Sequence, residues 1–349
     1  MRTVVFCLKD GQEEEKIRRA AEIIKAGGLV AFPTETVYGL GADALREEAA
    51  AKIYAAKGRP SDNPLIAHIA DRPAVYELAA HVSDWAKRLM DAFWPGPLTL
   101  IFPKKAIVPD DTTGGLSTVA VRMPSHETAR KLIRAAGVPI AAPSANTSGR
   151  PSPTTALHVL ADMDGKIDCI LDGGDAGFGL ESTIIDATGP VPVILRPGYI
   201  SGEMIREIVG RVETDRAVEQ PLGAGETPKA PGMKYRHYAP RAGLVIVAGS
   251  EEAVTARINA MTAEYEAAGK PCGVICTEET KAGYQCGNKK VIGSKMQQES
   301  IAHNLYAVLR QFDEEDTEII FSESFDGGQL GQAIMNRLKK AAGYHIIRV

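Results

Sequence analysis

The chain turns from a predicted helix into a predicted core strand at Lys57-Gly58-Arg59-Pro60-Ser61-Asp62-Asn63-Pro64-Leu65-Ile66-Ala67-His68. Gly58 and Pro60 stop the helix-like run 46–56, and residues 65–69 read as a buried strand. Two cations, Lys57 and Arg59, therefore stand on a rigid turn, an arrangement that suits a triphosphate or another polyanion. The alternative interpretation is a solvated helix end, where Lys and Arg are favoured in any case.

Composition places the chain among ordinary globular proteins. Its 349 residues predict two domains, with 44% hydrophobic and 24% charged residues. A net charge of −4 excludes a broadly basic nucleic-acid binder but allows a local basic groove. We expect no signal peptide and no membrane span. The five cysteines, of which only Cys272 and Cys276 are close in sequence, indicate reduced thiols in a cytosolic protein.

Two threonines follow the first predicted helix–strand pair. Residues 13–25 have helical apolar spacing and residues 29–32 form a short buried strand. The next segment, Pro33 to Ala44, contains G-x-G-x-x-A, but its glycines come several residues after the strand. We therefore reject a dinucleotide site. The hydroxyls of Thr34 and Thr36 are candidate ligand groups, and their alternative role is to hydrogen-bond the backbone of a turn.

A single arginine interrupts a later apolar strand. Helices are predicted at 73–80 and 83–93, with Ser83 as N-cap, and strands at 98–102 and 118–123. Alternation puts Thr118, Ala120 and Arg122 on one face. A guanidinium in that position can hold a carboxylate with two hydrogen bonds. The alternative is an edge-strand charge that faces water.

Small polar residues crowd the loop Pro143-Ser144-Ala145-Asn146-Thr147-Ser148-Gly149-Arg150, after a helix at 127–136 and a strand at 138–142. Ligands bind at the carboxyl ends of strands in α/β sheets, so this loop is a candidate site. It can also be a plain polar loop that caps a helix at 154–160. Further strands are predicted at 169–171, 182–186 and 191–195, then Arg196 and a helix that begins at Ser201.

Residues 213–241 lack periodicity and read as a linker, although their end, Pro231 to Pro240, is aromatic and basic. Beyond it, strands at 244–247, 273–276, 290–292, 317–321 and 345–348 alternate with three helices. That alternation predicts a small doubly wound α/β domain.

Several well-known catalytic motifs are missing from the sequence. There is no G-x-x-x-x-G-K-[ST], no H-E-x-x-H, no pair of C-x-x-C motifs and no G-x-S-x-G. What remains is a set of phosphate- and carboxylate-binding groups without a covalent nucleophile. Such a site catalyses by positioning and electrostatics.

Three motifs together carry a resemblance. Lys57-x-Arg59 with Ser144-x-Asn146 resembles the K-x-R…S-x-N signature of the YrdC-type domain. The segments Pro33 to Leu40 and Pro231 to Tyr238 are similar to the same family, threonylcarbamoyl-AMP synthase. The resemblance implies a twisted α/β domain with a concave basic face at 1–212, a linker or lid at 213–241 and a Rossmann-like domain at 242–349.

The family's activity follows as an expectation. Its members join L-threonine, bicarbonate and ATP into threonylcarbamoyl-adenylate and release pyrophosphate. Partner proteins use the adenylate to modify the adenosine next to the tRNA anticodon. The resemblance implies Mg²⁺ with ATP, no organic cofactor, no protein ligand for a metal and a cytoplasmic location without a membrane. It leaves a weak direct contact with tRNA open.

The resemblance also assigns roles to residues. Lys57 and Arg59 would be catalytic. The expected ATP-binding set is Lys57, Arg59, Asn63, Thr118, Ser144, Asn146, Ser152, Arg196 and Tyr235, with Tyr235 in the lid. The expected L-threonine-binding set is Thr36, His68, Arg122, the backbone near Ala142, and Ser182.

Two alternatives stay open. One is an RNA-binding module of the same fold, against which the net charge argues. The other is a carbamoyl-adenylate-forming enzyme of hydrogenase maturation, which carries acylphosphatase and zinc-finger modules that are not visible in this sequence.

Overall fold

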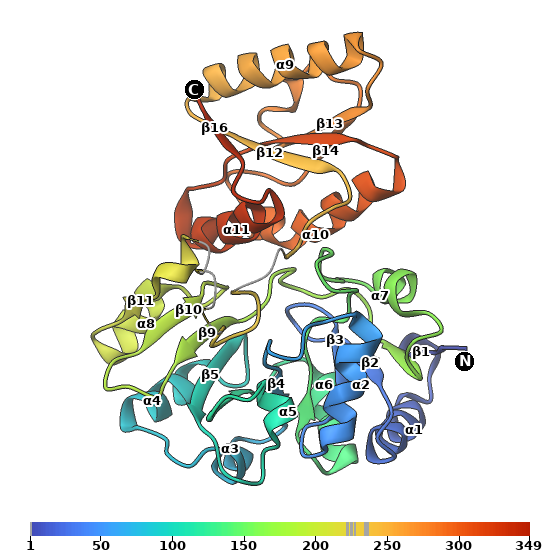
Figure 1. Cartoon of the computed structure of the whole chain (residues 1–349), viewed down its shortest axis with the longest axis vertical. Coiled ribbons are helices and arrows are strands. Elements are labelled where there is room, and N and C mark those ends of the chain that lie inside the picture. Colours follow the sequence, from blue (N-terminus) through green and yellow to red (C-terminus); the bar gives the residue numbers. More distant parts are fainter. Residues whose placement is uncertain (1, 221–222, 224–225, 227, 234–236) are drawn as a thin grey trace. The chain divides into compact units, whose positions relative to one another are not determined.

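The computed structural model describes residues 2–220, 223, 226, 228–233 and 237–349, which divide into two compact α/β units (Figure 1). The first unit comprises Met1–Ser148, Ser152–Gly177 and Glu181–Lys234. The second comprises Gly149–Pro151, Phe178–Leu180 and Tyr235–Val349. None of the helices among the described residues has the length and apolar character needed to cross a bilayer.

The first unit is built on a mixed sheet of 11 strands in the order β1-β8-β2-β3-β7-β4-β6-β5-β9-β10-β11. Its strands are β1 Val4–Cys7, β2 Val30–Phe32, β3 Gly39–Asp43, β4 Ile66–His68, β5 Leu98–Pro103, β6 Thr118–Arg122, β7 Ile140–Ala141, β8 Cys169–Asp172, β9 Thr183–Asp186, β10 Val193–Arg196 and β11 Glu213–Thr214. Its α-helices are α1 Glu13–Lys25, α2 Glu47–Lys57, α3 Val75–Leu78, α4 Asp84–Phe93, α5 Asp110–Thr113, α6 Glu127–Ala136, α7 Ala156–Met163 and α8 Gly202–Val209.

Local sequence rules explain where these helices begin and end. Ser83 and Ser201 cap α4 and α8 as expected, because each hydroxyl accepts a hydrogen bond from a backbone N–H three residues on. Gly58 ends α2 in the left-handed region, with φ at +61°. The turn after α2 therefore forms as the sequence predicts, and it sets the position of Lys57 and Arg59.

The glycine-rich segment after Thr36 is a buried strand, β3, which the sequence analysis does not predict. A Cβ atom at Gly41 would lie 2.7 Å from the Phe32 ring and 2.7 Å from Cγ2 of Ile140. The glycine is therefore required by close packing between β2, β3 and β7. Strand propensity disfavours glycine, so this strand is invisible to pattern analysis.

The loop that begins at Pro143 does not follow a parallel strand. β7 is only two residues long and runs antiparallel to both of its neighbours, β3 and β4. The rule about carboxyl ends of parallel strands therefore does not apply to this loop. Its position comes instead from backbone bonds to the segment before β3, with Ala145 N donating to Tyr38 O at 2.8 Å.

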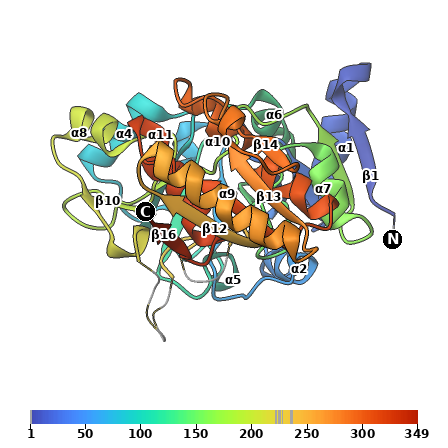
Figure 2. The ribbon, with the colours of Figure 1, turned by 90° about the horizontal axis from the view of Figure 1, so that it is seen from above.

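The second unit contains a five-stranded, wholly parallel sheet in the order β14-β13-β15-β12-β16, which confirms the predicted doubly wound fold. Helix α9 covers one face while α10 and α11 cover the other, and α9 lies along β12 and β13 (Figures 1 and 2). The elements are β12 Gly243–Ala248, α9 Glu251–Ala267, β13 Cys272–Cys276, β14 Lys289–Val291, α10 Gln298–Glu314, β15 Ile319–Glu323, α11 Gly328–Ala341 and β16 Ile346–Arg348.

Part of the segment expected as a linker belongs to the first unit. Glu213–Thr214 forms β11 at the edge of the large sheet. Ala230 and Met233, which are 0% and 5% exposed, pack in a cluster with Ile66 of β4 and Leu195 of β10. This end of the segment is therefore anchored on the sheet by apolar contacts.

Candidate active site

One row of the large sheet carries three of the predicted site residues. The register pairs His68 of β4 with Arg122 of β6, and Arg122 with Thr99 of β5. It then pairs Thr99 with Ile184 of β9, and Ile184 with Arg196 of β10. Directly paired residues of neighbouring strands project to the same face. The sheet therefore places His68 and Arg122 on one face. The register of β9 and β10 shifts between Ile194 and Arg196, but Arg196 Nη2 reaches Ser182 Oγ, which lies 2.8 Å from the Thr99 hydroxyl, so Arg196 lies on the same face.

Arg122 is buried, at 4% exposure, so the interpretation as an edge charge that faces water is wrong. Its Nη1 donates to Thr36 Oγ1 at 3.0 Å, and its Nε donates to the carbonyl oxygen of Gly96 at 3.4 Å. Its Nη2 lies 2.6 Å from Oε1 of Glu35 in an ion pair. Glu35 is not among the residues predicted from the sequence, although its place between two threonines of the motif is a signal for it.

Thr34 takes the backbone role considered for it, and Thr36 contacts Arg122. Thr34 Oγ1 donates to the carbonyl oxygen of Val37 at 2.6 Å, which fixes the turn. The two hydroxyl oxygens lie 2.9 Å apart, and Thr36 also receives the guanidinium of Arg122. The turn thus holds one arginine in a fixed orientation.

A second buried arginine lies at the end of β10. Arg196, at 5% exposure, donates from Nε to Ser182 O at 3.0 Å and from Nη2 to Ser182 Oγ at 3.2 Å. Ser182 Oγ lies 2.8 Å from the hydroxyl of Thr99, the strand neighbour of Arg122. Arg196 Nη1 also reaches the carbonyl oxygen of Pro231 at 3.5 Å. A continuous polar chain therefore runs beside both arginines and ends at the linker.

His68 is neutral at physiological pH. Burial, and after it the nearby charge of Arg122, lowers the pKa of its imidazole to about 3. Its Nδ1 lies 3.0 Å from the carbonyl oxygen of Ile66. If Nδ1 carries the proton in this contact, Nε2 is left as a hydrogen-bond acceptor.

Lys57 is not exposed to solvent, so the interpretation as a solvated helix end is wrong for this residue. It is 2% exposed, and its Nζ donates to the carbonyl oxygens of Ser144, at 2.5 Å, and Asn146. Arg59 is half-buried and donates from Nη2 to the carbonyl oxygens of Asn63, at 3.2 Å, and Pro64, at 3.1 Å. Both cations therefore order the loops that would surround a ligand.

Asn63 and Asn146 are buried near these cations. Asn63 is 2% exposed, and its Oδ1 has no hydrogen-bond partner among the described residues. Asn146, at 5% exposure, receives the hydroxyl of Ser144 on Oδ1 at 2.6 Å. An amide with an unused buried oxygen is a typical ligand contact, because such a group is costly to leave without a partner.

The remaining predicted residues are less directly connected. Ser152 is fully buried and donates to Oε1 of Glu181 at 2.5 Å, a carboxylate that the sequence analysis also missed. Ala142 N donates to Ile66 O at 2.9 Å, and Thr118 is half-buried at the start of β6. Tyr235 lies outside the described residues.

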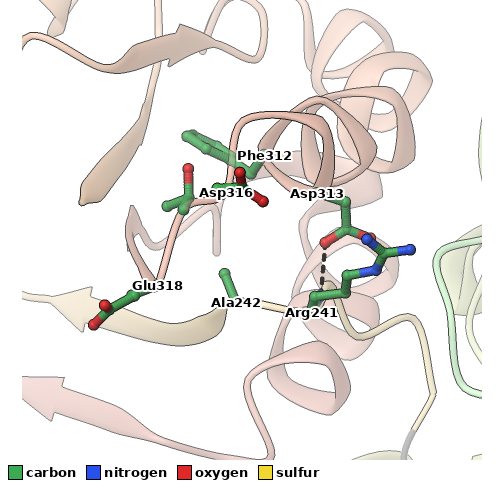
Figure 3. A pocket seen from close by; sticks show the side chains of 7 residues that line it. Arg241, Ala242, Phe312, Asp313, Asp316 and Glu318 are labelled. Carbon is green, nitrogen blue, oxygen red and sulfur yellow. Dashed lines mark hydrogen bonds between the residues drawn. The ribbon is translucent and has the colours of Figure 1, made fainter. Parts of the chain in front are cut away.

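The pocket shown in Figure 3 lies in the second unit and contains none of the predicted residues. Its volume is about 430 Å³, and its lining includes Arg241, Asp313, Asp316 and Glu318 (Figure 3). Asp313 Oδ1 accepts a hydrogen bond from the backbone N–H of Arg241 at 2.6 Å. Three carboxylates beside one arginine do not favour a triphosphate.

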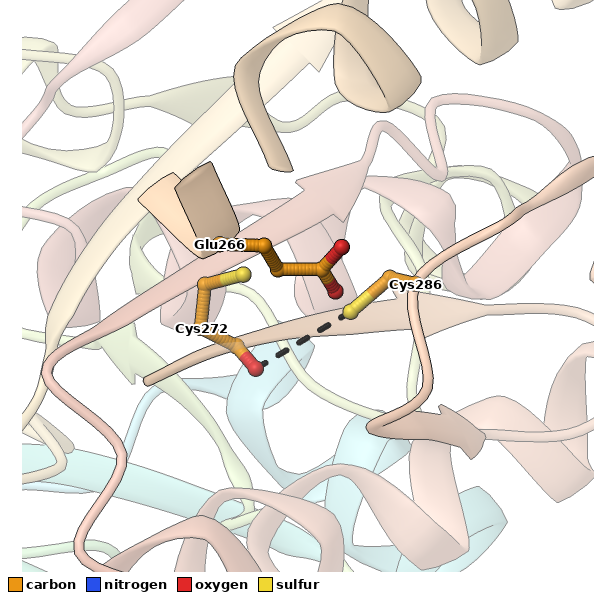
Figure 4. Close-up of side chains that lie close together, drawn as sticks. All are labelled: Glu266, Cys272 and Cys286. Carbon is orange, nitrogen blue, oxygen red and sulfur yellow. Dashed lines mark hydrogen bonds between the residues drawn. The ribbon is translucent and has the colours of Figure 1, made fainter. Parts of the chain in front are cut away.

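The second unit also brings together two cysteines that are 14 positions apart. Cys272, Cys286 and Glu266 form the one group of three metal-capable side chains found within the described ranges, with ligand atoms within 4.8 Å of one another (Figure 4). Burial raises the pKa of the Cys272 thiol to about 12. The Cys286 thiol donates to the carbonyl oxygen of Cys272 at 3.9 Å. These thiols therefore act as small buried groups that hydrogen-bond the backbone.

Comparisons with known proteins cover both units. A family model described as Telomere recombination matches residues 22–198, and one described as Threonylcarbamoyl-AMP synthase, C-terminal domain, matches residues 200–343. A threonylcarbamoyl-AMP synthase of Pyrococcus abyssi is 49% identical over 99% of this chain and 100% of its own length. One of Bacillus subtilis is 49% identical over 96% of this chain and 95% of its own length. The solved structure of P. abyssi Sua5 complexed with L-threonine is 47% identical, with a TM-score of 0.92 over 100% of both chains.

Proposed function

The chain belongs to the threonylcarbamoyl-AMP synthase family in its two-domain form, and on that premise we propose that it makes threonylcarbamoyl-AMP and pyrophosphate from L-threonine, bicarbonate and ATP. The product would serve partner proteins that modify the adenosine beside the tRNA anticodon. We propose that this reaction takes place in the cytoplasm.

The observation that carries the proposal is the row of His68, Arg122 and Arg196 on one face of the sheet. Arg122 offers a carboxylate-binding group in a buried setting. Arg196, together with Lys57 and Arg59, offers charge for a triphosphate. An enzyme that joins an amino acid to a nucleotide needs both kinds of group on one surface.

The reaction has two steps that balance. The ammonium group of L-threonine and bicarbonate give a carbamate, with loss of water and a proton. A carbamate oxygen then attacks the α-phosphorus of ATP, and pyrophosphate leaves. Arg122, with Thr36 and Ser182, would hold the threonine, while Lys57, Arg59, Asn63, Ser144, Asn146, Ser152 and Arg196 would hold the nucleotide. Fixed cations stabilise the charge that develops on the phosphates, and this positioning is the main source of catalysis.

Mg²⁺ would enter as the MgATP complex. The predicted nucleotide-binding groups are cations, amides and hydroxyls, which suit phosphate oxygens better than they suit the ion itself. The ion would then supply further charge neutralisation at the phosphates.

The direct test incubates the protein with MgATP, labelled bicarbonate and each of several amino acids, and measures pyrophosphate and the labelled adenylate. We expect adenylate with L-threonine and little with L-valine, which lacks the hydroxyl. Absence of adenylate, together with retention of tRNA in a filter-binding assay, would favour the RNA-binding alternative.

A further inference from the structure

Glu35 and Arg122 form a buried pair whose hydrogen-bonding capacity is not used up. They are 8% and 4% exposed, and Oε1 lies 2.6 Å from Nη2. Within the described part of the chain, neither oxygen of Glu35 accepts a hydrogen bond of proper geometry, and Nη2 of Arg122 donates none. Oε1 and Nη2 hold each other in the ion pair, so the atom that points to a ligand is the second oxygen of Glu35, because a buried polar atom is costly to leave without a partner.

The two charges of the pair fit a ligand that carries one positive and one negative group. Arg122 lowers the pKa of Glu35, against the effect of burial, so its carboxylate is ionised. The backbone N–H groups of Glu35 and Ser125 lie near the carboxylate, without hydrogen-bond geometry, and also favour the ionised form. Because His68 is neutral, the two facing charges are one positive and one negative. A simple anion would meet the repulsion of Glu35, whereas a zwitterion would pair with both groups.

We propose that Glu35 binds the α-ammonium group of the amino-acid substrate while Arg122 binds its carboxylate, so that Glu35 selects for a zwitterion. This inference rests on the proposed function, in which the substrate is L-threonine. Because its pKa is lowered, Glu35 holds the ammonium group without removing its proton. It is therefore a binding and specificity residue and not the base that frees the amine.

The test uses binding without catalysis, measured by calorimetry. Three ligands are compared: L-threonine, an analogue with hydroxyl in place of the ammonium group, and L-threoninol, which lacks the carboxylate. In the wild type we expect both analogues to bind at least about tenfold more weakly, because a charged partner is left unpaired. In Glu35→Gln, the preference for L-threonine over the hydroxyl analogue should fall by about tenfold or more, while the preference over L-threoninol should stay within about threefold.

Glu22→Gln is the matched control, because Glu22 is an exposed residue of α1 whose side chain is 60% accessible. It should leave both preferences unchanged. A contrary outcome is that Glu35→Gln loses the preference for the carboxylate, either by itself or together with the preference for the ammonium group. Either result would mean that Glu35 only orients Arg122, and the proposal would be overturned. An unchanged preference for the ammonium group overturns it as well.

Two further measurements cover the case in which Glu35→Gln does not fold. Glu35→Asp keeps the charge and should keep the preference for the ammonium group, at lower affinity. In the wild type, the affinity for L-threonine should fall as pH rises through the pKa of the amine, and a flat or rising profile would contradict the proposal. Wild-type protein that binds no L-threonine would refute the proposed function and the role of Glu35 with it, whereas the contrary results above, in a wild type that binds L-threonine, would overturn the role of Glu35 alone.

Discussion

At the scale of the residue, the two cations of the opening motif are not equivalent. Lys57 is enclosed and holds two carbonyl groups, whereas Arg59 is half-buried. Lys57→Ala would leave buried carbonyls without donors and is expected to destabilise the fold by about 1–3 kcal/mol for each. Arg59 also donates to the carbonyl groups of Asn63 and Pro64, but it is the more exposed of the two cations, so its substitution is the less disruptive test of the triphosphate contact.

Arg59→Ala should lower adenylate formation by roughly a hundredfold, about 2.7 kcal/mol of transition-state stabilisation, without a large change in the free energy of unfolding. Turnover and urea denaturation are measured on the same preparation. Arg72→Ala, in the turn before α3, serves as a control, since Arg72 is half-buried and pairs with Asp91 away from the predicted residues. Near-normal turnover of Arg59→Ala would remove this residue from the active site.

Arg122→Lys tests the contact with the threonine carboxylate. Arg122 already uses one N–H toward each of Thr36 and Gly96, and a lysine cannot make those bonds and hold a carboxylate with two parallel bonds as well. The KM for L-threonine should rise by about tenfold or more, while the KM for ATP should change by less than about threefold. Equal changes for both substrates would contradict the assignment.

His68 should make the fold sensitive to acid. Its pKa is about 3 in the folded protein and 6.5 in an ordinary environment, so between these values the unfolded chain binds a proton that the folded chain does not. The free energy of unfolding therefore falls as pH drops through this window. His68→Asn should reduce the slope by up to about 1.4 kcal/mol per pH unit, measured by urea denaturation from pH 4 to 7. The same substitution at exposed His81 should leave the slope unchanged, and an unaltered slope in His68→Asn would show that the imidazole is not held neutral.

At the scale of the element, the segment at 230–233 is anchored by burial. Ala230 is fully enclosed beside strands β4 and β10, and Pro231 O accepts from Arg196. Ala230→Glu should detach it, because a buried carboxylate without a partner is costly. We expect kcat/KM to fall at least about tenfold, with faster hydrogen exchange at 228–233.

Lys229→Glu is the matched control for this change, because it places the same carboxylate one residue earlier on a side chain that is 61% accessible. It should leave exchange and turnover close to the wild type. If both variants behave alike, the packing of the segment has no part in catalysis, and the idea that it closes over the site fails.

The elements also show what pattern analysis can and cannot predict. The helices and the parallel strands of the second unit follow from periodicity, because each repeats a helical or alternating apolar pattern. β3 does not, since it is glycine-rich, whereas the strand predicted at 138–142 is present as the two-residue β7. Lys57, Arg59 and Arg122 stand out in the sequence as charges in unusual places. Glu35 and Glu181 look like ordinary acidic residues until the fold buries them against Arg122 and Ser152.

At the scale of the whole molecule, two shortened chains separate the linker from the second unit. A chain that ends before Glu213 loses both, and should be nearly inactive. A chain that ends after Arg241 keeps the linker but loses Arg310 and Asp313, which contact Pro151 O at 2.6 Å and Arg150 at 3.1 Å in the second unit.

The longer of these two chains should retain only part of the activity. Residues 149–151, which lie between the predicted Ser144–Asn146 loop and Ser152, would lose their contacts with Arg310 and Asp313. Turnover at saturating and limiting ATP measures the effect. Arg310→Met in the full chain should reproduce part of this loss of activity. Full activity in the chain that ends before Glu213 would show that neither the linker nor the second unit is needed.

The pairing of β1 with β8 has a consequence for synthesis on the ribosome. Val4–Cys7 lies in register with Cys169–Asp172, so the first strand has no partner until about 160 further residues have been made. At about 5–20 residues per second, this delay is roughly ten to thirty seconds. During that time an apolar edge segment is exposed outside the tunnel, where a chaperone that binds nascent chains can hold it. Slower translation between codons 8 and 168 should therefore lower the yield of folded protein, and extra trigger-factor-like chaperone should restore it.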